Sequence, residues 1–136
     1  MPYITNFVFK DNEKSRKVNN KKSTILQAIL LDKFPNEYSF GIQFTIVFEN
    51  PYIEHSGFVK FCRSDGSTIA QSAGFKVNPS IEGSSETDDF EMLTGVAYEL
   101  EFENIRFERP GLYITKIYCN KEVIAKFGIT VAENEV

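Results

Sequence analysis

Four carboxylates gather in one polar stretch of the chain and are its best candidates for binding a metal ion. The stretch 78–91 reads NPSIEGSSETDDFE and contains no basic residue. Calcium prefers several oxygen ligands, which a flexible loop can supply. The candidate ligands are Glu86, Asp88, Asp89 and Glu91. Their spacing is not that of an EF-hand, so the stretch also fits a solvated loop or an acidic surface that engages a basic partner.

A second charged stretch, residues 10–22, is mainly basic. Five of its side chains are candidate partner-binding residues: Lys14, Arg16, Lys17, Lys21 and Lys22. Such side chains could contact phosphates in a salt-dependent way. The whole chain carries a formal net charge of −4, however. This acidic balance argues against nucleic acid and favours a protein as the partner.

The residues that could perform nucleophilic or metal chemistry are few. The chain has a single histidine, His55, and two cysteines, Cys62 and Cys119. Ser-His-Asp and Cys-His devices need a histidine beside a nucleophile, but His55 falls in a predicted loop, where we expect an exposed imidazole. No CxxC pair indicates a zinc site, and no glycine-rich phosphate-binding motif occurs. These observations predict a protein that is not an enzyme and needs no cofactor.

The sequence also predicts a compartment. Its start, MPYITNFVFKDNEK, lacks the basic segment and long apolar run of a signal peptide. No stretch approaches the 18 apolar residues that a transmembrane helix needs. We therefore expect a cytoplasmic protein, in which reducing conditions keep Cys62 and Cys119 as free thiols. Their separation along the chain would also allow a disulfide bridge.

The elements that would position these side chains are β-strands. Apolar and small or polar side chains alternate in YSFGIQFTIVF, residues 38–48, and this period of two predicts a half-buried strand. Residues 58–63 and 67–72 flank the dipeptide Asp65-Gly66. This dipeptide predicts a hairpin turn, because glycine accepts positive φ at little cost.

Alternation returns in the last third of the chain. Apolar side chains take every second position over 96–102, with Glu99, Glu101 and Glu103 between them. Glutamates in such positions are the ordinary water-facing side of a sheet rather than paired catalytic carboxylates. The apolar parity changes near Asn104, which predicts a β-bulge.

The stretch NIRFERPGLYITKIYCNKEVIAKFGITV, residues 104–131, predicts a further hairpin with its turn at Asn120-Lys121. Residues 113–119 and 123–131 would each place alternate side chains, starting with Tyr113 and Val123, on the core face. The opposite face keeps three apolar side chains, which are candidate partner-binding residues: Ile114, Tyr118 and Ile124. Apolar residues on an exposed sheet face often mark an interface, including that of a homodimer.

The first third of the chain is less clearly patterned. Residues 3–9 predict a strand, whereas residues 23–34 fit either an amphipathic helix or a strand, and we favour a strand because their neighbours are strands. Seven or eight strands with turns between them predict an all-β protein, an antiparallel β-sandwich. It would form a single domain, 1–136, with a basic connector at 10–22 and an acidic loop at 78–91.

Three stretches occur in an order that resembles a family of uncharacterised small bacterial and phage proteins. They are DKFPNEYSFGIQFTIVF, HSGFVKFCRSDGSTI and NIRFERPGLYITKI, and the resemblance covers about residues 25–131. It implies an immunoglobulin-like β-sandwich with no assigned activity. Its motifs are structural turns, so it carries no functional residue over to this chain.

Together these patterns favour a non-enzymatic bacterial or phage protein that acts through protein–protein contact, in a biological process that the sequence does not name. A homodimer is one form of such contact. The alternative is a metal- or ligand-binding module that uses the acidic loop 82–91, with calcium as the candidate ion.

Overall fold

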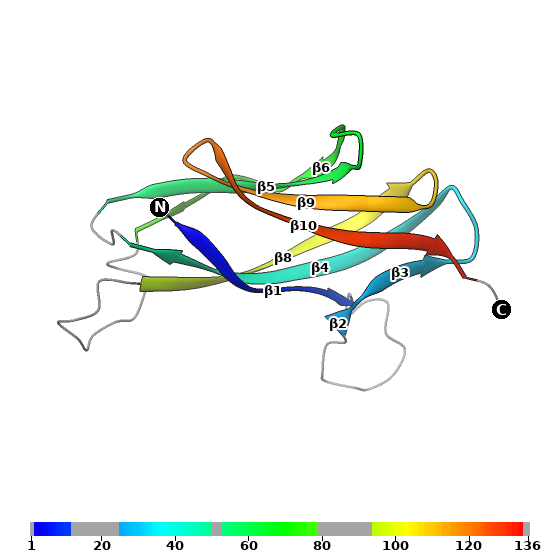
Figure 1. Cartoon of the computed structure of the whole chain (residues 1–136), viewed down its shortest axis with the longest axis horizontal. Coiled ribbons are helices and arrows are strands. Elements are labelled where there is room, and N and C mark those ends of the chain that lie inside the picture. The colour runs from blue at the N-terminus through cyan, green and yellow to red at the C-terminus, as the bar shows by residue number, and fades with distance from the viewer. Residues whose placement is uncertain (1, 12–24, 50–52, 79–93, 135–136) are drawn as a thin grey trace.

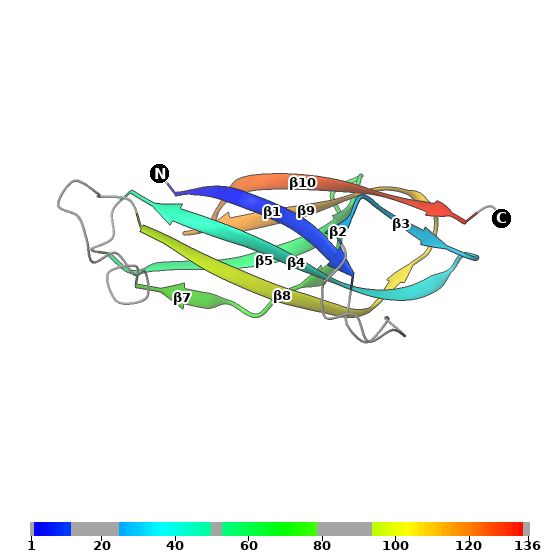
Figure 2. The same ribbon diagram turned by 90° about the horizontal axis from the view of Figure 1, so that it is seen from below.

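The computed structural model describes residues 2–11, 25–49, 53–78 and 94–134. These residues form ten strands: β1 (Tyr3–Asp11), β2 (Ile25–Leu26), β3 (Ala28–Leu31), β4 (Asn36–Phe48), β5 (His55–Arg63), β6 (Thr68–Gln71), β7 (Phe75–Val77), β8 (Thr94–Phe107), β9 (Gly111–Cys119) and β10 (Glu122–Glu133). Two sheets pack face to face (Figures 1 and 2), which confirms the predicted β-sandwich. Within the described ranges, no helix has the length and apolar character needed to cross a membrane.

The two sheets differ in size and connectivity. Sheet A has the strand order β2-β1-β4-β8, and sheet B has the order β3-β10-β9-β5-β6, with β7 also pairing with β5. Every pairing is antiparallel except that of β3 with β10. The number of strands exceeds the predicted seven or eight because residues 25–31 form two short strands, one in each sheet, and residues 75–77 add another.

The ambiguous segment 23–34 forms strands over 25–26 and 28–31, as we favoured, with bends at Gln27 and over 32–34. β2 pairs with β1 in sheet A, and after Gln27 the chain crosses to sheet B, where β3 pairs with β10. Ile29 and Leu31 are buried, whereas Ile25 is exposed. The crossing explains why the inward alternation begins only at Ile29.

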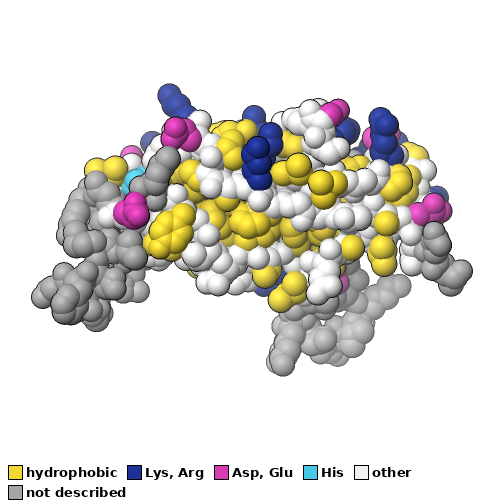
Figure 3. Space-filling view, viewed as in Figure 1, with side chains coloured by type: hydrophobic (Ala, Val, Ile, Leu, Met, Phe, Trp, Pro, Cys, Tyr) yellow, Lys and Arg dark blue, Asp and Glu magenta, His cyan; other side chains and the backbone are white. Residues whose placement is uncertain are grey.

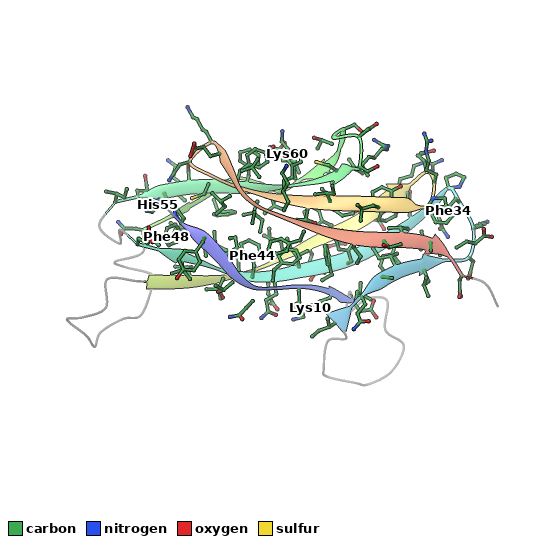
Figure 4. The ribbon with its side chains drawn as sticks, in the orientation of Figure 1. Lys10, Phe34, Phe44, Phe48, His55 and Lys60 are labelled. Atoms are coloured by element: carbon green, nitrogen blue, oxygen red, sulfur yellow. The ribbon has the colours of Figure 1, made fainter. Side chains whose placement is uncertain are left out.

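Strand β4 forms the centre of sheet A, between β1 and β8. Its alternating residues are all buried: Phe40, Ile42, Phe44, Ile46 and Phe48. Figure 4 shows Phe44 and Phe48 between the ribbons of the two sheets. A strand buried on one face by five such side chains has a strongly specified register, because a shift of one residue would expose all of them.

Sheet A keeps its apolar side chains inward by means of two β-bulges. On β1 the register shifts at Asn6, which has a positive φ of 56°, and Phe7 packs against the core. On β8 the register shifts around Asn104, with φ of 55°, so that Ile105 and Phe107 are buried. The predicted phase change near Asn104 is therefore confirmed.

The core between the sheets is mainly aromatic. The Phe61 ring lies 5.0 Å from that of Phe40 and 5.9 Å from that of Phe107, measured between centroids. At the side where β1 and β10 approach each other, Phe7 and Phe127 stack with centroids 3.9 Å apart. Aromatic contacts thus join sheet A to sheet B both in the centre and along this side of the sandwich.

Candidate interaction surface

Nine of the predicted site residues lie outside the described part of the chain. They are the basic residues Lys14, Arg16, Lys17, Lys21 and Lys22, and the acidic residues Glu86, Asp88, Asp89 and Glu91. The calcium site and the basic connector therefore stay predictions. Within the described ranges, no group of three or more His, Cys, Asp and Glu side chains could hold a metal ion.

The prediction of an exposed, loop-borne His55 is wrong. His55 is the first residue of β5 and only 5% of its surface is exposed. Its Nδ1 lies 2.9 Å from Nδ2 of Asn120, and its ring lies 4.4 Å from that of Phe48 (Figure 4). The Asn120 side chain also accepts a hydrogen bond from the Ser56 N–H at 3.0 Å. His55 therefore helps to hold the β9–β10 turn against β5.

Both cysteines are buried free thiols, as predicted. Cys119 faces the core, where burial raises the pKa of its thiol and keeps it protonated. Cys62 lies on another strand, with its sulfur 4.0 Å from the Thr68 hydroxyl. Protonated, buried thiols are poor nucleophiles, so Cys119 fits a packing role.

Two of the three predicted outer-face residues hold that position. Ile114 and Tyr118 lie half-buried on the outer side of β9. On β10 the register shifts between Val123 and Ala125, so that Val123 lies opposite Tyr118 and is 39% exposed, while Ile124 packs against the core. The predicted positions of Ile124 and Val123 are therefore wrong, because simple alternation takes no account of this bulge.

The outward side chains of β5, β9 and β10, here called the sheet B outer face, form three cross-strand rows. The register aligns Phe58 with Tyr118 and Val123, then Lys60 with Lys116 and Lys126. In the third row it aligns Ile114 with Cys62, which is buried, and with Gly128, which has no side chain. Two exposed leucines, Leu30 and Leu112, extend this face toward β3. The face thus combines apolar, aromatic and basic side chains.

An aromatic pair forms the first row. The rings of Phe58 and Tyr118 stack with centroids 4.5 Å apart and planes within 10° of parallel. The Lys60 ammonium lies 5.3 Å from the Tyr118 centroid and 5.8 Å from that of Phe58. Cation–π contact at this distance is favourable, so these three side chains form one ordered cluster on the outer face.

The lysine row is an electrostatic conflict. Neighbouring strands lie about 4.8 Å apart, and like charges directly opposite each other destabilise a sheet. No ion pair among the described residues involves Lys60, Lys116 or Lys126. Figure 3 shows Lys and Arg side chains standing out along the side formed by sheet B, and Figure 4 shows Lys60 pointing away from the sandwich.

The outer face of sheet A has the opposite character. Glu99, Glu101 and Glu103 are exposed on β8, as predicted. The Lys10 ammonium lies 2.9 Å from the Glu99 carboxylate and donates a hydrogen bond to the Gln43 side chain at 2.8 Å. The sandwich is therefore polarised, with an acidic outer face on sheet A and a basic one on sheet B.

A hollow of about 440 Å³, here called the β5–β7 hollow, adjoins the aromatic pair. Its lining residues are Ser56, Gly57, Phe58, Gly74, Phe75, Lys76 and Lys121. A Cβ atom at Gly57 would lie 2.6 Å from the Tyr118 carbonyl oxygen and 2.9 Å from the Phe75 ring. Gly57 is therefore required for the close packing of β5 against the β9 backbone and the Phe75 ring.

A smaller hollow of about 250 Å³ is lined by Arg63, Asp65 and Arg109, among other residues. The backbone N–H and the hydroxyl of Ser67 donate to Asp65 at 2.8 and 2.7 Å and lower the pKa of its carboxyl group, to which the two arginines contribute further. This carboxylate offsets part of their positive charge. The smaller hollow is thus a weaker candidate for binding an anion than the β5–β7 hollow.

No family model matches the chain, and no curated protein sequence matches it. Its fold is similar to part of the Pseudomonas fluorescens alkylpurine DNA glycosylase AlkC, bound to DNA containing an abasic site analog, with a TM-score of 0.51 and 12% sequence identity. The match covers 96% of this chain but 30% of the glycosylase. A β-glucosidase from Listeria innocua, in complex with isofagomine, matches with a TM-score of 0.45 and 13% identity, over 96% of this chain and 17% of the enzyme. The glycosylase match supports the β-sandwich fold alone.

Proposed function

We propose that this domain is a non-enzymatic protein-binding module whose contact surface is the sheet B outer face. The observation that carries the proposal is the row of Lys60, Lys116 and Lys126, which face one another without an ion pair among the described residues. Such a row destabilises the free protein and would become favourable against an acidic surface. The aromatic pair and the exposed Leu112, which lie toward opposite ends of β9, supply apolar contact area.

The same row argues for a partner other than a second copy of the chain. A symmetric dimer is isologous, so each subunit contributes the same patch. Two sheet B outer faces packed in this way would bring two lysine rows into one interface, and like-charge juxtaposition opposes such association. A different, acidic protein avoids this repulsion.

The edges of the sheets support contact through a face rather than by strand addition. Edge strands invite pairing with other chains, and β-bulges are one means of blocking it. Bulges occur at Asn6 on β1, at Asn104 on β8 and at Ile124 on β10. Each of these strands has a free edge along part of its described length.

We further propose that the sandwich is immunoglobulin-like and belongs with the small bacterial and phage proteins that the sequence resembles. The hairpin turn at Asp65-Gly66, which lies within the second resembling stretch, supports this proposal. The free thiols of Cys62 and Cys119 support a cytoplasmic location.

Affinity capture from a lysate of the source organism tests the proposed surface. The variant Ile114→Glu/Tyr118→Glu should lose at least about tenfold of the protein captured by wild type, because it places two charges in the apolar part of the interface. The matched control Gln43→Glu/Ala97→Glu adds the same charge to the outer face of sheet A and should capture as wild type does. Circular dichroism verifies that both variants are folded. Equal loss in both, or loss in neither, would contradict the proposal.

A further inference from the structure

We infer that the β5–β7 hollow holds an apolar side chain from an acidic segment of a protein partner. The inference rests on the proposed function and adds the partner's chemistry. Ligand sites are typically concave and mostly apolar, with a few polar groups that set orientation. The β5–β7 hollow has this composition, since aromatic residues and glycines form most of its described lining, and Ser56 and two lysines complete it.

The shape of the hollow comes from two glycines. Gly57 allows Phe75 and the β9 backbone to approach closely, as a Cβ there would clash with both. At Gly74 a Cβ would meet only the Gly57 carbonyl oxygen, at an ordinary distance of 3.8 Å. The space beside Gly74 is therefore open, and an aromatic or branched aliphatic side chain from another molecule could lie there against Phe58.

The charges around the hollow predict an acidic partner. Lys76 and Lys121 line it, and none of the described residues that line it is acidic. Neither lysine has an ion pair within the described ranges, although Glu122, which is exposed, follows Lys121 along the chain. Lys60 lies over the adjoining aromatic pair. A partner that carries carboxylates around one apolar residue would complement this arrangement.

Lys121 occupies a backbone position that favours glycine. Its φ is 74° and that of Asn120 is 53°, so both central residues of the β9–β10 turn are left-handed. Asn-Gly is the preferred pair in such a turn. Residues held in sparsely populated conformations cluster at functional sites, and here the retained side chain is one of the two cations beside the hollow. The Asn120 contacts to His55 and Ser56 fix that turn on β5.

The aromatic pair favours protein over nucleic acid. Single-stranded nucleic acid stacks its bases on free aromatic faces, but Phe58 and Tyr118 stack on each other, and Lys60 lies over both rings. The ring faces that a base would need are thus partly occupied. An apolar hollow beside two cations suits a carboxylate-rich peptide better than a phosphate backbone.

Fluorescence polarisation with short labelled peptides tests the inference. The main probe alternates Glu and Gly around one central Phe, and two comparison probes replace Phe by Ser or every Glu by Gln. We expect each replacement to weaken binding about tenfold, which corresponds to about 1.4 kcal/mol. A labelled poly-dT oligonucleotide is the nucleic-acid probe and should bind more weakly than the main peptide. Equal binding of the Phe and Ser peptides, tighter binding of the oligonucleotide, or no peptide binding at millimolar concentration would overturn the inference.

Two pairs of variants locate the binding. Gly74→Leu should fill the hollow and weaken peptide binding at least about tenfold, whereas Ala97→Leu, on the outer face of sheet A, should not change it. Lys76→Gln/Lys121→Asn should weaken binding about tenfold, and Lys33→Gln/Arg106→Gln, with the same change in net charge outside both hollows, should leave it within about twofold. Wild-type affinity in Gly74→Leu would overturn the inference, as would a concentration-dependent dimer that Gly74→Leu abolishes.

Lysate capture separates this inference from the proposed function. Capture that depends on Ile114 and Tyr118 but survives Gly74→Leu and high salt would refute the acidic, hollow-anchored partner and leave the protein-binding surface standing. Capture that is unchanged in Ile114→Glu/Tyr118→Glu would refute the proposed surface itself.

Discussion

The outer faces of the two sheets place their charged side chains differently. On sheet A, the ammonium of Lys10 meets Glu99 and Gln43, so charges lie beside compatible neighbours. On sheet B, three lysines face one another across β5, β9 and β10. In a sequence that specifies one fold, local propensity, hydrophobic pattern, packing and electrostatics usually favour the same structure. Exceptions concentrate at functional sites. The contrast therefore favours sheet B over sheet A as the candidate interaction surface.

The largest expected effect compares an inner with an outer phenylalanine on β5. Phe61 is fully buried among aromatic rings, and its replacement by Ala should lower the free energy of unfolding by about 3–5 kcal/mol. Phe58 is half-buried on the sheet B outer face, and Phe58→Ala should lower it by only about 1–2 kcal/mol, because the variant loses an aromatic pair and a partly buried apolar surface. Urea denaturation of both variants measures the difference.

Equal losses of stability would show that the outer aromatic pair is a structural element like the core. The contrast between the faces would then lose its functional meaning. A large loss of partner capture in Phe58→Ala, with a small loss of stability, would strengthen it.

The second comparison concerns the two hairpin turns of sheet B. Gly66 has φ of 96° and open space around its Cα, so Gly66→Ala meets no steric contact and should lower stability through the backbone alone, by about 1–2 kcal/mol. Lys121→Gly should raise stability by about 0.5 kcal/mol, because release of left-handed strain exceeds the greater chain entropy of glycine. Thermal unfolding of both variants measures the two effects. Destabilisation by Lys121→Gly would mean that its side chain stabilises the fold rather than serving the hollow.

The sequence predicts some of these features well and others not at all. Uninterrupted alternation over 38–48 predicts the buried face of β4, and the parity change predicts the bulge at Asn104. At the β1 bulge, Phe7 is followed directly by Val8 and Phe9, so either parity fits and no shift is visible. Local patterns report local structure, and they succeed where a single parity is present.

Features that depend on contacts between distant segments cannot be predicted from local sequence patterns. His55 is buried partly by Asn120, which lies 65 residues away. Each lysine of the row Lys60, Lys116 and Lys126 looks like an ordinary water-facing residue of its own strand. Only the strand order and register bring them together, so the candidate surface could not be recognised before the fold.

The third comparison sets the central lysine of the row against the paired lysine of sheet A. Lys116→Gln removes like-charge repulsion from both sides and should raise stability by about 0.2–1 kcal/mol. Lys10→Gln removes an exposed ion pair and should lower stability by about 0.2–1 kcal/mol. Salt should reduce both differences, because screening weakens each interaction. Chemical denaturation at low salt measures both changes in stability. Changes of opposite sign would support the contrast between the faces, and changes of the same sign would contradict it.

The smallest expected effect concerns Asp65, in the β5–β6 turn at one end of sheet B. Hydrogen bonds from the Ser67 N–H and hydroxyl favour the charged carboxylate and lower its pKa in the folded protein. This contribution to stability is therefore present above the ordinary aspartate pKa and is lost as the pH falls through the lowered value. Ser67→Ala removes one of the two donors, so an NMR titration should show the Asp65 midpoint rising without reaching its ordinary value. Ser64→Ala, which removes a neighbouring hydroxyl without a hydrogen bond to Asp65 in the described structure, should leave the midpoint unchanged. An unchanged midpoint in Ser67→Ala would show that the backbone N–H and the nearby arginines account for the shift, and that the order of this turn owes little to its serine.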